Sequence, residues 1–124
     1  MKQKVNIFIS WFQELGNAWV QKNPDAVLSL LADKFLYYET PFTKPFTTKK
    51  EILLLWQEVP NSQKNISFSF DLLSINNNTG IAHWKASFTR LKSNKKAHLD
   101  GIFLVRLNQK GLCTLFKMWY NSKE

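Results

Sequence analysis

The spacing of apolar residues changes once along the chain, between about residues 60 and 66. Before this point apolar side chains recur every three or four positions, which is the spacing of an amphipathic helix. After it they alternate with polar side chains, which is the spacing of a strand with one buried face. The pattern therefore predicts a helical first half and a stranded second half.

The first half predicts three helices. Residues 5–22 form the first, because one face collects apolar side chains at helical spacing (Val5, Phe8, Phe12, Leu15 and Trp19). A short second helix follows Asn23, a favoured N-cap, with Pro24 at its first position and an end near residue 31.

The third helix is predicted over residues 48–59. Thr48 and Glu51 match a capping box, in which each side chain binds the other residue's backbone N–H. We expect this helix to stop before Pro60, because a proline disfavours helical geometry in the residue that precedes it.

The strands are separated by turn sequences. The aromatic segment 35–46 predicts a short strand that leads into an ordered loop, since two prolines interrupt it. Four further strands are expected around residues 66–72, 81–91, 97–107 and 112–120, joined by the turns NNNTG, SNKK and NQKG. Helices followed by hairpins indicate an α+β fold with the helices on one face of an antiparallel sheet.

The length and composition of the chain limit the number of domains, the possible disulfides and the expected location of the protein. A length of 124 residues predicts a single domain over residues 1–124, and 44% hydrophobic residues suffice for one core. The single cysteine, Cys113, excludes a disulfide within the chain and a site of several thiolates, and it favours a reducing compartment. Polar residues interrupt the apolar N-terminal segment and nothing approaches a membrane span, so we expect a soluble, cytoplasmic protein without a membrane partner.

The formal net charge of +8 makes nucleic acid a candidate binding partner. The basic residues are spread along the chain, however, and the densest run, RLKSNKK at 90–96, is read as a solvated turn. Nucleic-acid binding is therefore disfavoured.

The order of the predicted elements resembles a known family. The segments NPDAVLSLLADKFLYYETP and LDGIFLVRLNQKGLCTLFKMWY, with the capped helix between them, resemble the nuclear transport factor 2-like superfamily and in particular its SnoaL-like branch. The resemblance covers almost the whole chain. It implies a cone-shaped, cystatin-like curved antiparallel sheet wrapped around three N-terminal helices, an apolar cavity between them, and a homodimer formed through the outer sheet face. Members include enzymes and non-enzymes, so the fold alone does not supply a function.

Asp100 is the main candidate for chemistry, because it is a carboxylate in the apolar strand AHLDGIFLVRL. Alternation places it on one face with His98, Ile102, Leu104 and Arg106. We expect this face to line the cavity, where scarce solvent would raise the pKa of the Asp100 carboxyl. The alternative is a solvated carboxylate or one paired with a lysine.

The resemblance to individual enzyme classes is incomplete. Ketosteroid isomerases have a similar layout with an inward strand aspartate, but their catalytic base would fall at Thr40 and their first-helix tyrosine near Leu15. Glu39 is one residue away from the position of the base, and we expect it to point to the other side. Limonene epoxide hydrolases need an Asp-Arg-Asp set, whose arginine position is His98 here. SnoaL-type cyclases, which rely on a lone aspartate, remain the best match.

The other candidate site residues differ in their expected position relative to Asp100. His98 and Tyr38 would assist Asp100, whereas His83 is expected on the outer, partly wet side. Two histidines are too few for a metal site, so no metal or other cofactor is expected. A set of large apolar side chains would line the ligand pocket (Trp19, Trp56, Trp84, Ile102, Leu104 and Trp119).

Two functions follow from the sequence. The first is a protein that binds a small apolar or aromatic molecule, with cofactor-free isomerase, cyclase or dehydratase chemistry through Asp100. The second is a non-catalytic module whose own aromatic residues fill the cavity and whose outer sheet face binds a second copy or another partner.

Overall fold

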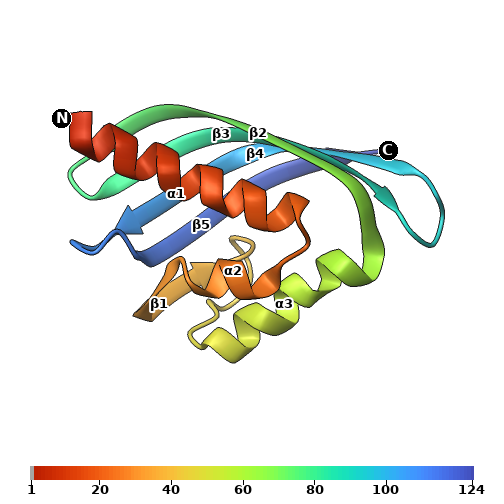
Figure 1. The fold of residues 1–124 in the computed structure, drawn as a ribbon, viewed down its shortest axis with the longest axis horizontal. Helices are drawn as coiled ribbons and strands as arrows, with labels where there is room; N and C mark the ends of the chain where they lie inside the picture. The colour runs from red at the N-terminus through yellow and green to blue at the C-terminus, as the bar shows by residue number, and fades with distance from the viewer. Residues whose placement is uncertain (1) are drawn as a thin grey trace.

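The computed structural model describes residues 2–124 and has the α+β architecture expected from the sequence. Three helices and five strands follow one another along these residues (Figure 1): α1 Lys2–Val20, α2 Pro24–Leu28, β1 Leu31–Tyr38, α3 Lys49–Ser62, β2 Gln63–Asn76, β3 Thr79–Arg90, β4 Lys96–Leu107 and β5 Cys113–Lys123.

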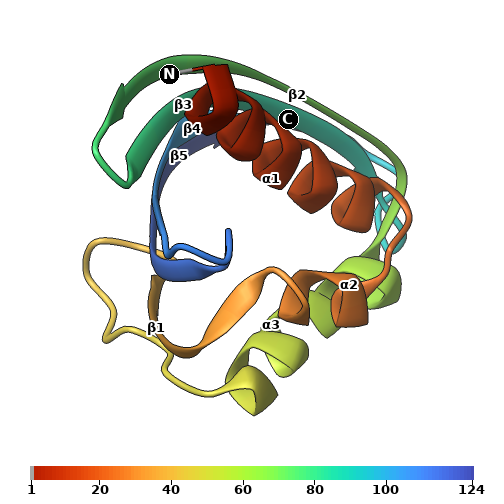
Figure 2. The same cartoon turned by 60° about the vertical axis from the view of Figure 1, so that its left-hand side comes forward.

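The strands form one curved sheet in the order β1-β5-β4-β3-β2. Strands β2 to β5 make the expected antiparallel meander, but β1 runs parallel to β5, so the sheet is mixed. It curls around α1 without closing, and α2 and α3 lie across its open side (Figure 2). The concave face therefore encloses the space between the sheet and the helices.

Aromatic side chains form most of the core. The buried face of α1 presents Phe8, Trp11, Phe12, Leu15 and Trp19 to the sheet, whereas Val5, predicted on the same face, is 39% exposed near the start of the helix. Phe12 stacks on Phe103 of β4 with ring centroids 5.9 Å apart. Each such ring contributes about 1.5–3 kcal/mol when it is fully buried.

The capping predictions are confirmed. The Thr48 hydroxyl accepts a hydrogen bond from the Glu51 N–H at 3.2 Å, and the Glu51 carboxylate accepts one from the Thr48 N–H at 3.1 Å. Further N–H donation from Thr47 helps to lower the pKa of the Glu51 carboxyl. At α2, the Asn23 side chain accepts from the Ala26 N–H as an N-cap.

Several predicted ends were wrong, among them that of the second helix, which stops at Leu28 rather than near residue 31. Helix α3 continues past Pro60 to Ser62, where the Ser62 hydroxyl donates to the Glu58 carbonyl and the Gln63 N–H donates to the Val59 carbonyl. These bonds satisfy the last carbonyls, so a proline in the final turn is tolerated. Strand β1 begins at Leu31 rather than near residue 35, because Leu31 pairs with Cys113 of β5. Because Leu31 and Cys113 are far apart in the sequence, no local sequence pattern marks the start of this strand.

Among the described residues, no helix is both long and apolar enough to cross a membrane.

Candidate functional site

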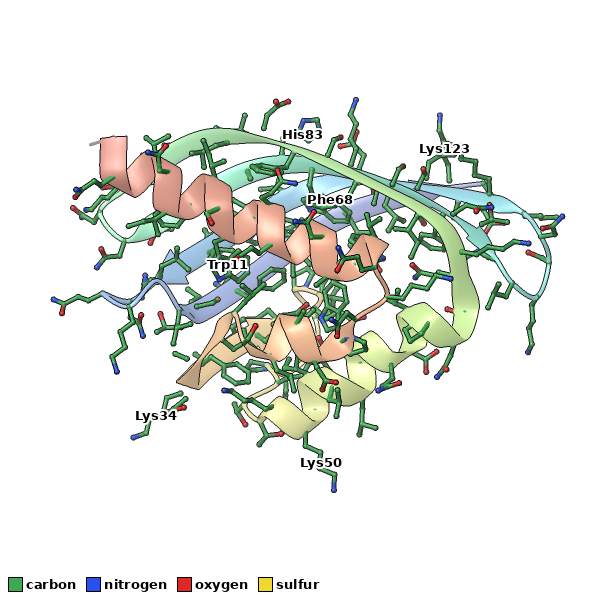
Figure 3. The ribbon with its side chains drawn as sticks, in the orientation of Figure 1. Trp11, Lys34, Lys50, Phe68, His83 and Lys123 are labelled. Atoms are coloured by element: carbon green, nitrogen blue, oxygen red, sulfur yellow. The ribbon has the colours of Figure 1, made fainter. Side chains whose placement is uncertain are left out.

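The two faces of the sheet have opposite surroundings. On β4, Gly101, Phe103 and Val105 are buried under the helices, whereas the even-numbered residues face outward. The prediction that Asp100 shares a face with His98, Ile102, Leu104 and Arg106 is confirmed by this pattern, but the shared face is the outer one. Figure 3 shows His83, on the neighbouring strand, on the side of the sheet away from α1.

The expected position of Asp100 in an apolar cavity is wrong. Its side chain is 57% exposed, and its Oδ1 atom lies 2.7 Å from Nε2 of His83. The odd-numbered residues of β4, from Ala97 to Leu107, are all apolar, whereas the even-numbered ones include His98, Asp100 and Arg106, so the alternation itself indicates which set faces inward. The set with Gly101, Phe103 and Val105 is inward because α1 packs on it.

Several other predicted site residues also lie on the outer face. Tyr38 is there beneath Lys117, whose ammonium is 5.2 Å from the ring centroid. His98 is exposed on the same face, and Ile102 pairs with Trp119, which is 41% exposed. Leu104 lies beside them. Neither His98 nor Tyr38 therefore lies on the concave, inner face of the sheet.

A cavity lies on the inner side, between α3 and the concave face of the sheet. Its volume is about 180 Å³. Three of the predicted pocket tryptophans come together around it, and most of its wall is apolar (Trp19, Trp56, Trp84, Leu55, Val59, Leu99, Phe103, Phe116 and Met118). Its polar wall groups come from Tyr37, Glu39, Glu58, Gln63 and Tyr120.

The tryptophans bring three indole N–H groups to this region. Trp56 donates to the Tyr37 hydroxyl at 3.2 Å, and Trp19 donates to the Gln63 side-chain oxygen at 2.9 Å. The Trp84 N–H is buried and has no acceptor among the described residues. Burial also raises the pKa of the Tyr37 hydroxyl, which stays protonated.

Glu39 is the carboxylate that the sequence reasoning missed. Strand β1 directs Tyr37 inward and Tyr38 outward, so alternation brings Glu39, two positions after Tyr37, back to the inner side. The expectation that it points to the other side was wrong. The reciprocal backbone hydrogen bonds between Tyr37 and Phe46 fix the base of the loop that follows. Partial burial raises the pKa of the Glu39 carboxyl.

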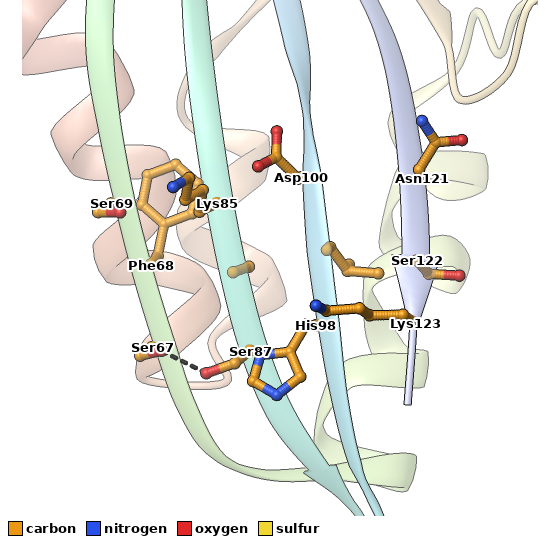
Figure 4. Close-up of a pocket in the computed structure, with 12 residues that line it drawn as sticks. Ser67, Phe68, Ser69, Lys85, Ser87, His98, Asp100, Asn121, Ser122 and Lys123 are labelled. Carbon is orange, nitrogen blue, oxygen red and sulfur yellow. Dashed lines mark hydrogen bonds between the residues drawn. The ribbon is translucent and has the colours of Figure 1, made fainter.

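Two open grooves lie on the outer side. One, of about 690 Å³, passes His83, Asp100, Ile102, Trp119 and the exposed Phe42. It shares Glu39, Met118 and Tyr120 with the cavity, so these three residues mark where the two spaces adjoin. The second, of about 490 Å³, is lined mostly by polar residue types, and in it the Ser67 and Ser87 hydroxyls lie 2.6 Å apart (Figure 4).

Cys113 lies in the core rather than in any of these spaces. It is fully buried and bonds the Leu115 carbonyl, and burial raises the pKa of its thiol to about 12. Cys113 is therefore a packing residue.

Solved structures share this fold over nearly the whole chain. A putative isomerase from Bacillus subtilis aligns with a TM-score of 0.82 and 14% identity, over 95% of this chain and 88% of that one. SalBIII, an epoxide hydrolase/cyclase-like enzyme with a role in pyran ring formation in salinomycin, aligns with a TM-score of 0.79 and 8% identity, over 97% and 92%. A computationally designed 17-OHP binder aligns with a TM-score of 0.75 and 17% identity, over 93% and 94%.

At these identities the alignments establish the fold and not the activity. No curated protein matches the sequence. The SnoaL-like domain, by contrast, matches residues 12–116, which include the second half of α1, the cavity tryptophans, Glu39 and the first residues of β5. This chain belongs to the SnoaL-like domain family.

Proposed function

We propose that this protein binds a small, largely apolar molecule in the inner cavity and moves a proton on it through Glu39. The observation that carries the proposal is the position of Glu39, a carboxyl with a raised pKa at the wall of a mostly apolar cavity. Asp100, the residue favoured by the sequence, is solvated on the opposite face.

The chemistry follows from this environment. A carboxylate whose ionised form is poorly solvated is a stronger base than one in water, and its acid form survives closer to neutral pH. Glu39 can therefore take a proton from one atom of the ligand and return it to another. This is the step that isomerisation, cyclisation and dehydration share. It consumes no external reactant, and in a dehydration water leaves as a second product.

The similar structures support proton-transfer chemistry of this class only through the fold that they share with this protein. Neighbours described as a putative isomerase and as an epoxide hydrolase/cyclase-like enzyme use the same architecture. The step proposed for Glu39 needs no bound cofactor.

The test is hydrogen–deuterium exchange into carbonyl compounds incubated with the protein in D₂O, followed by mass spectrometry. We expect the wild-type protein to catalyse exchange and Glu39→Gln to slow it about 10²-fold or more, the usual contribution of a general base. Asp100→Asn is the matched control and should leave the rate unchanged. Exchange that survives in Glu39→Gln, or that is lost in Asp100→Asn, contradicts the proposal.

A second candidate function uses the outer face. There Ile102 lies between Trp119 and His83, next to Ile81 and Leu104, so apolar side chains from β3, β4 and β5 form one continuous row. Trp119 and Leu36, at the far side of the face, are each 41% exposed. This row favours a homodimer through the sheet, which would serve a non-catalytic module as well as an enzyme.

A further inference from the structure

We infer that the outer face of the sheet carries a second binding site, which takes the phosphoryl group of a small phosphate monoester. The site is the groove of about 490 Å³ that contains the Ser67 and Ser87 hydroxyls, and we call it the serine groove. It lies on the opposite face of the sheet from the inner cavity, so the inference goes beyond the proposed function and does not depend on it.

The strand register brings the polar side chains of the serine groove together. Directly opposite residues in a sheet share one face, and Ser67 pairs with Ser87, which in turn pairs with His98. His98 pairs with Lys123, so these four residues form one row across β2, β3, β4 and β5. Figure 4 shows the Lys123 side chain extending from β5 towards β4 and the His98 ring beside Ser87. Lys85, two residues before Ser87, lies on the same face and also lines the groove.

Two further lysines extend the positive charge beyond this row. Lys64 and Lys96 both pair with Thr89, which follows Ser87 by two residues and lies on the same face of β3. Together with the two lysines of the groove, they make four lysines in the row of the serine pair and the rows next to it. This part of the outer face therefore attracts anions.

The carboxylate nearest to these lysines in register is already bonded to another residue. Asp100 pairs with Lys85 and lines the groove, but its Oδ1 atom lies 2.7 Å from Nε2 of His83. The other ion pair among the described side chains joins Arg90 to Glu124. Within the described part of the chain, none of the four lysines has a carboxylate partner, so their charge is available to a ligand.

The set of donors favours a phosphoryl group. One of the two serine hydroxyls donates to the other across 2.6 Å, which leaves one hydroxyl proton for a ligand. Hydroxyl, imidazole and ammonium donors come together from four adjacent strands. Such a set suits three oxygen atoms with about two negative charges better than the two oxygens of a carboxylate, and a phosphate monoester has this composition near pH 7.

The volume and the surroundings of the groove favour a small ligand over a nucleic acid strand. Pockets for small organic ligands span about 300–1,000 Å³, which includes the volume of the serine groove. Single-stranded nucleic acids bind with their bases stacked on aromatic side chains. Among the described residues, the exposed aromatic side chains (Phe42, Trp119 and Tyr120) line the other outer groove instead.

The test measures dissociation constants by protein-observed NMR for four probes at about pH 7.5, where a phosphate monoester is mostly a dianion. Phenyl phosphate represents the proposed ligand, dimethyl phosphate is a diester with one charge, benzoate is a carboxylate, and oligothymidylate represents nucleic acid. We expect phenyl phosphate to shift resonances of the serine groove and to bind about tenfold or more tightly than dimethyl phosphate and benzoate.

Variants assign the binding to residues. The double change Lys85→Gln/Lys123→Gln should weaken phenyl phosphate binding about tenfold. The control Lys34→Gln/Lys50→Gln removes the same charge from exposed residues on the side of the molecule away from Lys123, and it should change the affinity less than about twofold (Figure 3). Ser87→Ala should weaken binding about threefold, which a diffuse positive charge without a specific site would not produce.

Several results would overturn the inference. Dimethyl phosphate or benzoate binding as tightly as phenyl phosphate would overturn the assignment to a monoester, and no shift of groove resonances with phenyl phosphate would overturn the site itself. Equal losses in the two double variants, or no loss in Ser87→Ala, would show that binding follows net charge alone. Oligothymidylate that binds more tightly than phenyl phosphate and loses affinity in Lys85→Gln/Lys123→Gln would identify a nucleic-acid surface instead. None of these measurements involves deuterium exchange through Glu39, so the proposed function is tested separately.

Discussion

Glu39 and Asp100 are both strand carboxylates, yet they have different electrostatic surroundings. Glu39 has no hydrogen-bonding partner among the described residues and is partly removed from water, which raises the pKa of its carboxyl. Asp100 is 57% exposed and bonded to the imidazole of His83. Poor solvation is what makes a carboxylate useful as a base, and it also makes the ionised form costly to the fold.

This cost gives a pH-dependent prediction. The folded-state pKa of Glu39 is raised above its ordinary value of 4.5, so the folded protein is relatively more stable below that value and loses this contribution as pH rises through the raised pKa. We expect Glu39→Gln to raise the melting temperature by about 2 °C at pH 7. The gain should shrink towards zero near pH 4, where wild-type Glu39 is protonated. Thermal unfolding between pH 4 and pH 8 measures it, and a gain that grows on acidification would contradict it.

Helix α1 approaches the sheet closely at one glycine. A Cβ atom at Gly16 would lie 2.3 Å from a ring carbon of Phe68 on β2, far inside normal contact. Phe68 cannot move away easily, because its ring already packs on Trp19, Phe70, Trp84 and Phe103. The glycine thus allows α1 to lie directly on β2, which sets the position of Trp19 at the cavity.

We therefore expect Gly16→Ala to destabilise the protein by about 1–2 kcal/mol, because overpacking outweighs the better helix propensity of alanine. Asn17→Ala, an exposed change in the same helix, is the control and should have little effect or a slightly stabilising one. Phe68→Leu in the Gly16→Ala background should recover part of the loss. Urea denaturation of the wild type, Gly16→Ala, Phe68→Leu and the double variant measures the coupling, and a stabilising Gly16→Ala would show that the two elements have room to separate.

Sequence reasoning succeeded for local features and for the order of the elements. The capping box at Thr48, the turn at Asn77 and the period-two strands are written in neighbouring residues, so they could be predicted. The facing of β4 was assigned wrongly although the sequence carries it, because the residues of its inward set, from Ala97 to Leu107, are all apolar, whereas the outward set includes Lys96, His98, Asp100 and Arg106. Asp100 was misplaced together with the facing of β4, and the inward position of Glu39 became visible only when β1 was placed beside β5, whereas Trp19, Trp56 and Trp84 do meet at the cavity.

The curved sheet presents a broad outer surface that no described element covers. Its row of apolar side chains, from β3 to β5, predicts self-association through this face. Leu104→Lys would place a charge in the centre of the row, and Leu73→Lys would place one on β2, at a residue that is already 58% exposed. We expect sedimentation to show a dimer for the wild type and for Leu73→Lys, and a monomer for Leu104→Lys. A wild-type monomer at micromolar concentration would contradict the prediction.

Strand β1 pairs with β5 only up to Tyr38 and Lys117, whereas β5 continues to Lys123. Beyond that pair, near Glu39 and Tyr120, where the cavity and the outer groove adjoin, this edge of β5 has no neighbouring strand among the described residues. Peptide groups at this rim can bind a polar solute whatever side chains surround them. Relatives of this protein could therefore replace every side chain of the cavity wall and bind different ligands. They would still keep the main-chain hydrogen-bonding groups of β5 at the rim.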